Sequence, residues 1–379
     1  WGNKPMNARP GAPAPLPPAA PPRAHRLTAV VVSALLLIGV CAGGWMLANA
    51  KLPAEKLLPS KWADGEAGQA INQALRLPIQ NEGDLVGAAL RYRLLGDTGD
   101  QVALGCPDWL FYRDGLRPQP GAGAKVFTDR VRLMQHWSQQ MRAKGVQLLV
   151  VVVPDKSRIE QAHTCGLRYS EPMRARYGQW QQALAEAKVP SVDLLPVLSA
   201  QDVPVFFRTD VHMNRIGAQR AADVVTAAAL PLLGGQGGQA FEVGPLGAPK
   251  PRMGDLIVLA GLEHVGPAWR PSLDQEPEQV IAPVRSGGLL DDTPPVEVLL
   301  LGSSNGRRSL FAERLGHGLG REVWNQSMDG GQFSGALLAA WPQQATWPPT
   351  LKLVIWEFSE MALSLPLTEG EQKALAGID

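Results

Sequence analysis

The chain has 379 residues, 45% of them hydrophobic, which is enough to bury a large core in one big domain or two smaller ones. Its 36 basic and 35 acidic side chains give a net charge of +1. This balance provides no strong positive field, so no nucleic-acid partner is expected. Charged residues are only 19% of the chain, whereas glycine and proline are abundant, which favours a loop-rich α/β protein.

The N-terminal part divides into a polar tail and an apolar run. Residues 1–26 are rich in Pro and Ala and have almost no apolar periodicity, which predicts a disordered tail. Residues 27–47 are apolar almost throughout and carry no charge. At ~1.5 Å of rise per residue a helix over this run reaches roughly 31 Å, which predicts one transmembrane anchor.

The charges beside the apolar run predict its orientation. Arg23 and Arg26 directly precede it, so the positive-inside rule places the N-terminus in the cytoplasm and the large C-terminal part outside. A cleaved signal peptide is the alternative, because Ala48-Asn49-Ala50 resembles a cleavage site. The run exceeds a typical signal core in length, which favours a retained single-pass anchor.

The chain contains three cysteines. Cys41 lies in the apolar run, whereas Cys106 and Cys165 lie in the later part. If that part is exported, an oxidising compartment favours a disulfide between Cys106 and Cys165, with two free buried thiols as the alternative. No Cys/His cluster has the spacing of zinc ligands, so we expect neither a metal site nor a cofactor.

The remaining chain alternates predicted helices and strands. Residues 48–84 are predicted to be a juxtamembrane helical linker, and residues 85–379 the main domain. Strands are predicted at 102–105, 109–112, 146–153, 191–194, 296–301, 323–325 and 351–358. Helices are predicted at 129–144, 173–187, 215–230, 309–319 and 334–341. This alternation argues for an α/β fold in which helices cover a parallel sheet.

A long segment at 233–295 interrupts the alternation. It is rich in Gly, Pro and polar residues, and Asp255–Leu262 is its one apolar island. We interpret it as a loop-rich insertion that carries substrate or partner contacts.

Two short motifs offer a nucleophile, a base and a carboxylate. Ser303-Ser304 follows the predicted strand 296–301, and ligands of parallel sheets bind beyond the carboxyl ends of strands. A serine hydroxyl needs a base to take its proton, and His212 is the candidate. Asp210 lies two residues earlier, on the same side of an extended segment, where it can fix the imidazole tautomer. Singly, each motif has a plainer interpretation, as a helix cap or a surface pair.

Three groups are candidate donors to an oxyanion. They are the backbone N–H at the helix start around Ser304, the turn at Gly330-Gly331, and the side chain of Asn325. The plainer interpretation of the last two is a tight turn and a polar residue at a strand end.

Seven segments together resemble a known family. They are Trp109–Tyr112, Val151–Lys156, Arg208–Asn214 with Gly217-Ala218, Arg252–Leu256, Leu301–Ser304, Asn325–Gly331 and Val354–Glu357. In this order they resemble the motifs of the SGNH-hydrolase-like alginate O-acetyltransferases of the bacterial cell envelope, the AlgJ/AlgX type. The similarity covers most of residues 85–365. The chain ends soon after its last predicted strand, which favours the shorter, membrane-anchored type of member.

The resemblance implies a fold and a set of site residues. The fold is an SGNH-hydrolase-like α/β/α sandwich with a parallel central sheet. Ser304 occupies the third place of Gly-x-Ser and is therefore the nucleophile, with Asp210 and His212 as its partners. Met213 stands where the family usually has Trp, and Asn305 where an aromatic or small residue is common. Both departures concern the acceptor-side pocket rather than the triad.

The resemblance also implies a function. An acetyl-serine would form at Ser304 and pass its acetyl group to a hydroxyl of a secreted exopolysaccharide on the periplasmic side of the bacterial inner membrane. A membrane-bound O-acyltransferase would supply the acetyl group, with other exopolysaccharide biosynthesis proteins as further partners. Lys156, Arg307 and Arg308 are candidate contacts to the polymer, although each also fits a structural or solvated role. The alternatives are an acetyl-esterase with the same triad and a non-catalytic scaffold that binds polymer or partner.

Overall fold

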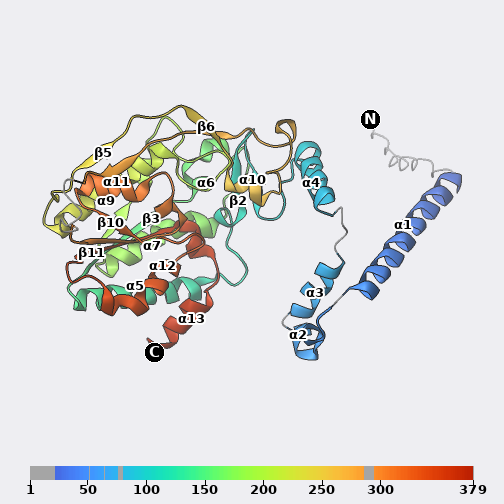
Figure 1. The fold of residues 1–379 in the computed structure, drawn as a ribbon, viewed down its shortest axis with the longest axis horizontal. Helices are drawn as coiled ribbons and strands as arrows, with labels where there is room; N and C mark the ends of the chain where they lie inside the picture. Colours follow the sequence, from blue (N-terminus) through green and yellow to red (C-terminus); the bar gives the residue numbers. More distant parts are fainter. Residues whose placement is uncertain (1–21, 51, 64, 76–79, 286–293, 379) are drawn as a thin grey trace, which may run out of the picture. The chain divides into compact units, whose positions relative to one another are not determined.

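The computed structural model describes residues 22–50, 52–63, 65–75, 80–285 and 294–378 (Figure 1). The chain forms two compact units, Trp1–Asn81 and Glu82–Asp379. Residues 1–21 of the predicted disordered tail, 1–26, lie outside the described residues.

The first unit is helical. Helix α1 covers Pro22–Asn49, and its part Leu27–Asn49 is long and apolar enough to cross a membrane. This is compatible with the predicted single-pass anchor. The helix begins five residues before the predicted span, at a proline, which is favoured in the first turn because its missing N–H would have no partner there. The shorter elements that follow are η1 (Ala54–Leu57), α2 (Pro59–Ala63) and α3 (Glu66–Ala74).

The second unit is built around a five-stranded parallel sheet with the strand order β10-β9-β11-β3-β4. Its strands are β3 (Gln147–Val153), β4 (Ser191–Asp193), β9 (Val298–Leu301), β10 (Val323–Asn325) and β11 (Leu353–Ser359). The long strands β3 and β11 are almost continuously apolar because helices cover both faces of the sheet.

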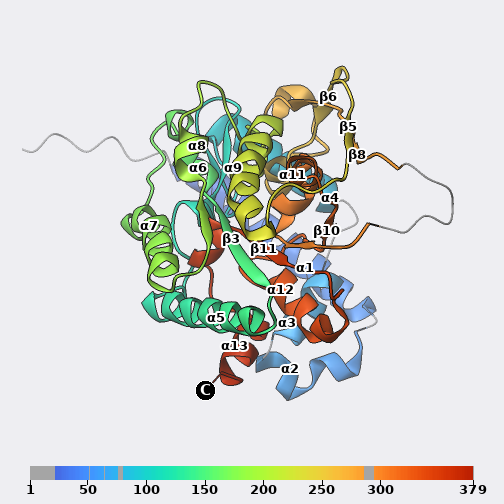
Figure 2. The same ribbon diagram turned by 90° about the vertical axis from the view of Figure 1, so that its left-hand side faces the viewer.

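Helices cover the two faces as outer layers (Figures 1 and 2). Alternate strand residues point to opposite faces, so Val150 and Trp356 belong to one core and Val151 and Ile355 to the other. The first core lies against α5 (Ala124–Ala143), α7 (Glu171–Glu186), α12 (Gly335–Ala340) and α13 (Glu369–Ala376). The second lies against α8 (Leu195–Ser199), α9 (Arg215–Leu233) and α11 (Phe311–Leu319). The predicted three-layer sandwich is confirmed.

Helices α5 and α13 are examples of differences from the prediction. Helix α5 begins at Ala124, five residues before the predicted start, after the extended residue Gly123. Helix α13 was not predicted, because it is short and follows the last strand. A capping box between Thr368 and Glu371 stabilises its first turn.

The insertion at 233–295 contains regular structure. Its described part forms two antiparallel strand pairs, β5 (Phe241–Val243) with β8 (Ile281–Pro283) and β6 (Pro249–Arg252) with β7 (Asp274–Pro277). It also contains α10 (Asp255–Leu259) and η5 (Pro267–Trp269). The strands escaped prediction because each has only three or four residues, and because β6 and β7 consist largely of charged residues and proline.

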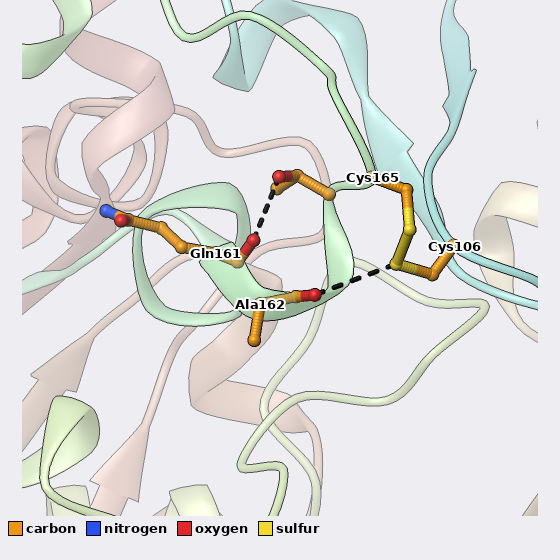
Figure 3. The surroundings of a disulfide bond; sticks show 5 residues. Cys106, Gln161, Ala162 and Cys165 are labelled. Carbon is orange, nitrogen blue, oxygen red and sulfur yellow. Dashed lines mark hydrogen bonds between the residues drawn. A yellow bond between two sulfur atoms is a disulfide. The ribbon is translucent and has the colours of Figure 1, made fainter.

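The hairpin β1 (Val102–Leu104) and β2 (Leu110–Tyr112) precedes the sheet, and its turn carries Cys106. Cys106 forms a disulfide with Cys165, which confirms the predicted pair (Figure 3). The Cys106 backbone N–H also donates to the His163 carbonyl at 2.8 Å, and the His163 ring stacks on Trp109. The disulfide therefore adds a covalent link between the β1–β2 turn and the segment at 163–165, which already contact each other.

Short elements complete the second unit. They are α4 (Gln80–Leu90), η2 (Arg91–Leu95), η3 (Arg113–Gly115), α6 (Lys156–Ile159), η4 (Gln161–His163), η6 (Ser304–Arg307), η7 (Trp341–Thr346) and η8 (Glu360–Ser364).

Candidate active site

Ser304, His212 and Asp210 lie together beyond the carboxyl end of β9. The Ser304 Oγ lies 2.7 Å from Nε2 of His212, and Nδ1 of His212 lies 2.5 Å from Oδ1 of Asp210. Because the carboxylate only accepts hydrogen bonds, Nδ1 carries the imidazole proton and Nε2 is left to accept from the serine hydroxyl. The backbone N–H of His212 also donates to Asp210, at 3.0 Å. The arrangement is that of a nucleophile, a base and a base-orienting carboxylate.

The insertion supplies partners that keep Asp210 ionised. The Arg252 guanidinium, at the end of β6, donates to Oδ2 of Asp210 at 3.0 Å, and the backbone N–H of Asp255 donates to the same oxygen at 3.3 Å. Burial raises the pKa of Asp210, but the hydrogen bond and charge of His212 and the charge of Arg252 outweigh it. The net result is a pKa well below the usual range. Arg252 was not predicted as a site residue, although it opens one of the family-like segments.

Asp274, from β7, fixes the segment that precedes Asp210. Its carboxylate accepts from the backbone N–H and hydroxyl of Thr209, at 2.9 and 2.6 Å, and from the backbone N–H of Arg208 at 3.1 Å. Sequence analysis missed it because 65 residues separate it from Thr209. Residues of the insertion therefore help to position the backbone that carries Asp210.

Asp255 is a second carboxylate beside the base. Its Oδ2 lies 3.5 Å from Nδ1 of His212, and its side chain is 46% exposed. Burial and the charge of Asp210 raise its pKa. Ligand atoms of Asp210, His212 and Asp255 lie within 4.8 Å of one another, which is close enough to hold a metal ion. However, both nitrogens of His212 are engaged and Arg252 already neutralises Asp210, so the donor set fits a base-orienting role better than a cation.

The two neighbouring serines have different partners. The Ser303 backbone N–H donates to Glu357 at 2.7 Å, and its hydroxyl lies 3.0 Å from each oxygen of that carboxylate. The Ser303 side chain also accepts from the backbone N–H of Asn305, as the N-cap of η6. Only Ser304 of the pair faces His212, which agrees with the choice implied by the family resemblance.

The predicted oxyanion donors are placed differently from the expectation. The Gly331 N–H donates to the Met328 carbonyl at 3.1 Å, because Gly330 closes a turn in the left-handed region. The Asn325 amide donates to the Gly306 carbonyl at 2.8 Å and so ties β10 to η6. The Gly331 N–H and one N–H of the Asn325 amide are therefore engaged by carbonyls. The backbone N–H of Ser304 occupies the first position of η6, where helical N–H groups lack an intrahelical partner.

Lys156 is a buried structural clamp and not an exposed substrate contact. Its side chain is 4% exposed, and Nζ donates to the carbonyls of Leu110, Arg208 and Asp210, at 2.6, 2.7 and 3.0 Å. These bonds use all three N–H groups of the ammonium. Burial lowers the pKa of Lys156 to about 7, against the charges of neighbouring carboxylates such as Asp210, which raise it. Lys156 therefore positions the backbone of the Asp210 segment.

Two hollows are lined by Ser304, and a third shares Arg308 with one of them. A cleft of about 540 Å³ contains Ser304 and His212, and a smaller pocket of about 120 Å³ beside the same pair is lined largely by apolar groups. Arg308 also borders a third hollow of about 520 Å³. Its charged lining consists of the cationic Arg215, Lys250, Arg252, Arg307, Arg308 and Arg314 and of the acidic Glu276 and Glu278. Arg307 and Arg308 both lie near the Asp329 carboxylate, at 3.8 and 3.3 Å.

Comparison with known proteins identifies the family. Residues 102–360 match the family model described as "SGNH hydrolase-like domain, acetyltransferase AlgX". The chain belongs to this family of SGNH hydrolase-like acetyltransferase domains. Both the predicted fold and the predicted enzyme class, an acetyltransferase, are confirmed.

Individual relatives support the same conclusion. The chain is 26% identical over 297 residues to the probable alginate O-acetylase AlgJ of Azotobacter vinelandii, covering 76% of each chain. It is 24% identical over 306 residues to the Pseudomonas aeruginosa protein of the same name, covering 76% of this chain and 77% of that one. The O-acetyltransferase domain of Pseudomonas putida AlgJ superposes with a TM-score of 0.64 at 26% identity, over 73% of this chain and 99% of that one. Pseudomonas aeruginosa AlgX shares the fold, with a TM-score of 0.55 at 21% identity, over 72% of this chain and 64% of that one.

Proposed function

We propose that this chain O-acetylates a secreted bacterial exopolysaccharide in the periplasm, through an acetyl-enzyme formed at Ser304. The observation that carries the proposal is the hydrogen-bonded line from Ser304 through His212 to Asp210 in a chain of an acetyltransferase family.

In the first half-reaction, Nε2 of His212 removes the Ser304 proton as Oγ attacks the carbonyl carbon of the acetyl donor. The imidazolium that forms is stabilised by the ionised Asp210. When the tetrahedral intermediate collapses, the bond to the leaving group breaks and His212 returns the proton to that group. The product is acetyl-Ser304, and His212 is neutral again.

In the second half-reaction, a sugar hydroxyl takes the place of the departed leaving group. His212 removes the hydroxyl proton, the sugar oxygen attacks the acetyl carbonyl, and the ester bond to Ser304 breaks. The serine oxygen then recovers the proton from His212. If water attacked instead, the same residues would act as an esterase, so selection of the sugar over water decides between the two activities.

The sizes and linings of the hollows suggest which one holds the acetyl group and which one holds the polymer. The pocket of about 120 Å³ has apolar walls, including Val153, Val211 and Met361, and suits a methyl group better than a hydrated sugar. The wider cleft suits a polymer that passes the serine. Relatives are named alginate O-acetylases, and an acidic polymer would complement the cationic hollow bordered by Arg307 and Arg308. The predicted polymer contacts at these two arginines remain part of the proposal.

The N-terminal helix fits a tethered enzyme. In the proposed orientation the N-terminus is cytoplasmic and the catalytic domain periplasmic, with α1 in the inner membrane. A membrane-bound O-acyltransferase would deliver the acetyl group, and the tether would raise the effective concentration of that partner and of other exopolysaccharide biosynthesis proteins.

One experiment separates the three candidate activities. The full-length protein in detergent is incubated with an activated acetyl ester, with and without an oligouronate acceptor. Acetylated oligosaccharide supports the transferase. Free acetate alone, unchanged by the acceptor, would make the chain an esterase, and no turnover of the ester would leave only a scaffold.

A further inference from the structure

Glu357 is a buried carboxylate beneath the nucleophile that the proposed mechanism does not use. It lies on β11, the central strand, and is 1% exposed. Its Oε2 accepts from the backbone N–H of Ser303 at 2.7 Å, and both oxygens lie 3.0 Å from the Ser303 hydroxyl. The fit leaves no room for a side chain at Gly302, because a Cβ there would lie 2.9 Å from Oε2.

The same carboxylate reaches the residue on the other side of the nucleophile through Ser303. The backbone N–H of Asn305 donates to the Ser303 hydroxyl at 3.3 Å, and that hydroxyl lies 3.0 Å from both oxygens of Glu357. Burial raises the pKa of Glu357 to about 7, while the bonds from Ser303 and the charge of His212 act in the opposite direction.

The neighbours of Glu357 make His212 the charged group to consider. Its strand neighbours are Val151 on β3 and Gly302 after β9, and neither titrates. The nearby residues of the turn 303–305, which are Ser303, Ser304 and Asn305, are also uncharged. His212 faces it from the segment before α9 and is the source of the charge that favours its ionised form.

We propose that Glu357 is a positioning residue which, as a carboxylate, holds the turn 303–305 so that the Ser304 hydroxyl meets Nε2 of His212. Ser303 offers Glu357 an N–H and an O–H, and an ionised carboxylate can accept from donors at both of its oxygens. A protonated carboxyl presents an O–H in place of one acceptor, so the turn loses a partner and the serine loses its alignment. This inference rests on the proposed function of Ser304.

The proposal predicts a distinctive pH dependence. Acetylation of Ser304 requires His212 in its neutral form and Glu357 in its ionised form, which are two separate deprotonations. On the acid side, a plot of log kcat/KM against pH should therefore approach a slope of 2 in the wild type. Glu357→Gln imitates the protonated carboxyl at every pH, so its slope should be 1.

The test measures the rate of acetyl-Ser304 formation from an activated acetyl ester, with full-length wild type, Glu357→Gln and Glu371→Gln. Glu371 is a matched control, because it is equally buried but pairs with Arg130 in the first core. We expect Glu357→Gln to lower kcat about 10- to 100-fold through misalignment, with KM for the ester within about twofold. Glu371→Gln should retain the slope of 2. Ser303→Ala keeps the backbone N–H that Glu357 accepts and should lose less activity.

A spectroscopic readout keeps the inference separate from activity. In Ser304→Ala, the infrared C=O band of the protonated Glu357 carboxyl should disappear as the pH rises through about 7, and Glu357→Gln should lack this band. A wild-type slope of 1, or a Glu357→Gln variant with the wild-type rate, would overturn the positioning role while acetyl-Ser304 still formed. A wild type that forms no acetyl-Ser304 would overturn the proposed function as well.

Discussion

The disulfide between Cys106 and Cys165 allows a stability prediction worked from the structure. The bond closes a loop with a sequence separation of 59 residues. The chain-entropy relation for such a loop gives on the order of 4 kcal/mol at 25 °C. Disulfides often contribute less than this relation gives, because the unfolded chain without the bond retains residual structure. We therefore expect the variant in which both cysteines become serine to lose about 2–4 kcal/mol of unfolding free energy.

Equilibrium unfolding in urea of the full-length protein measures this change. Cys41→Ser is the matched control, because Cys41 is a free cysteine in α1, and it should leave the transition of the catalytic domain in place. The acetyl-transfer rate of the double variant under native conditions should stay within about twofold of the wild type, because neither cysteine contacts the triad. A loss below about 1 kcal/mol would show that the entropic reasoning is wrong. Two free thiols in protein from the native compartment would contradict the bond itself.

Three further predictions concern buried charges. Asp210→Asn should lower kcat on the order of 10⁴-fold in the ester assay, because an amide does not fix the tautomer of the base. Asp255→Asn should lower kcat less than about tenfold in the same assay, because the Asp255 side chain is about half exposed to solvent. Lys156→Met removes the donor to three carbonyls. A urea titration should show a loss of about 2–5 kcal/mol of unfolding free energy, together with reduced activity. An unchanged unfolding free energy would contradict the structural role of Lys156. The pKa of Glu357 is raised to about 7, so its stabilising contribution is present below the usual pKa of 4.5 and is lost as the pH rises through 7. Wild type should lose roughly 3 kcal/mol from this group over that range, and Glu357→Gln should lack that component.

The parts of the fold with strong local patterns could be predicted from the sequence. The apolar runs that form β3 and β11 identify strands covered on both faces, and the helix predicted at 215–230 is present as α9. The nucleophile was accessible for the same reason, since Ser303-Ser304 directly follows a predicted strand. Asp210 and His212 were singled out by their spacing and by the family resemblance. The strand pairs β5–β8 and β6–β7 could not be predicted, because strands of three or four residues show too little periodicity and their register depends on contacts across the insertion.

The supporting residues of the site depend on contacts that sequence spacing does not reveal. Arg252 and Asp274 come from the insertion and meet the Asp210 segment only after the chain has folded back. Lys156 follows a strand, as many substrate contacts do, and nothing in its sequence position indicates that its ammonium turns inward to three carbonyls. The donors predicted at Gly331 and Asn325 are used by nearby carbonyls, since turns and strand ends satisfy their own polar groups first.

The central claim is that Ser304 carries the acetyl group. Its most direct test is to mix the full-length protein with an activated acetyl ester, quench in acid, and locate the added acetyl group by peptide mass spectrometry. The account predicts acetylation at Ser304 in the wild type and in Ser303→Ala, with none in Ser304→Ala. Acetyl-Ser303, or acetylated oligosaccharide produced at the wild-type rate by Ser304→Ala, would contradict it.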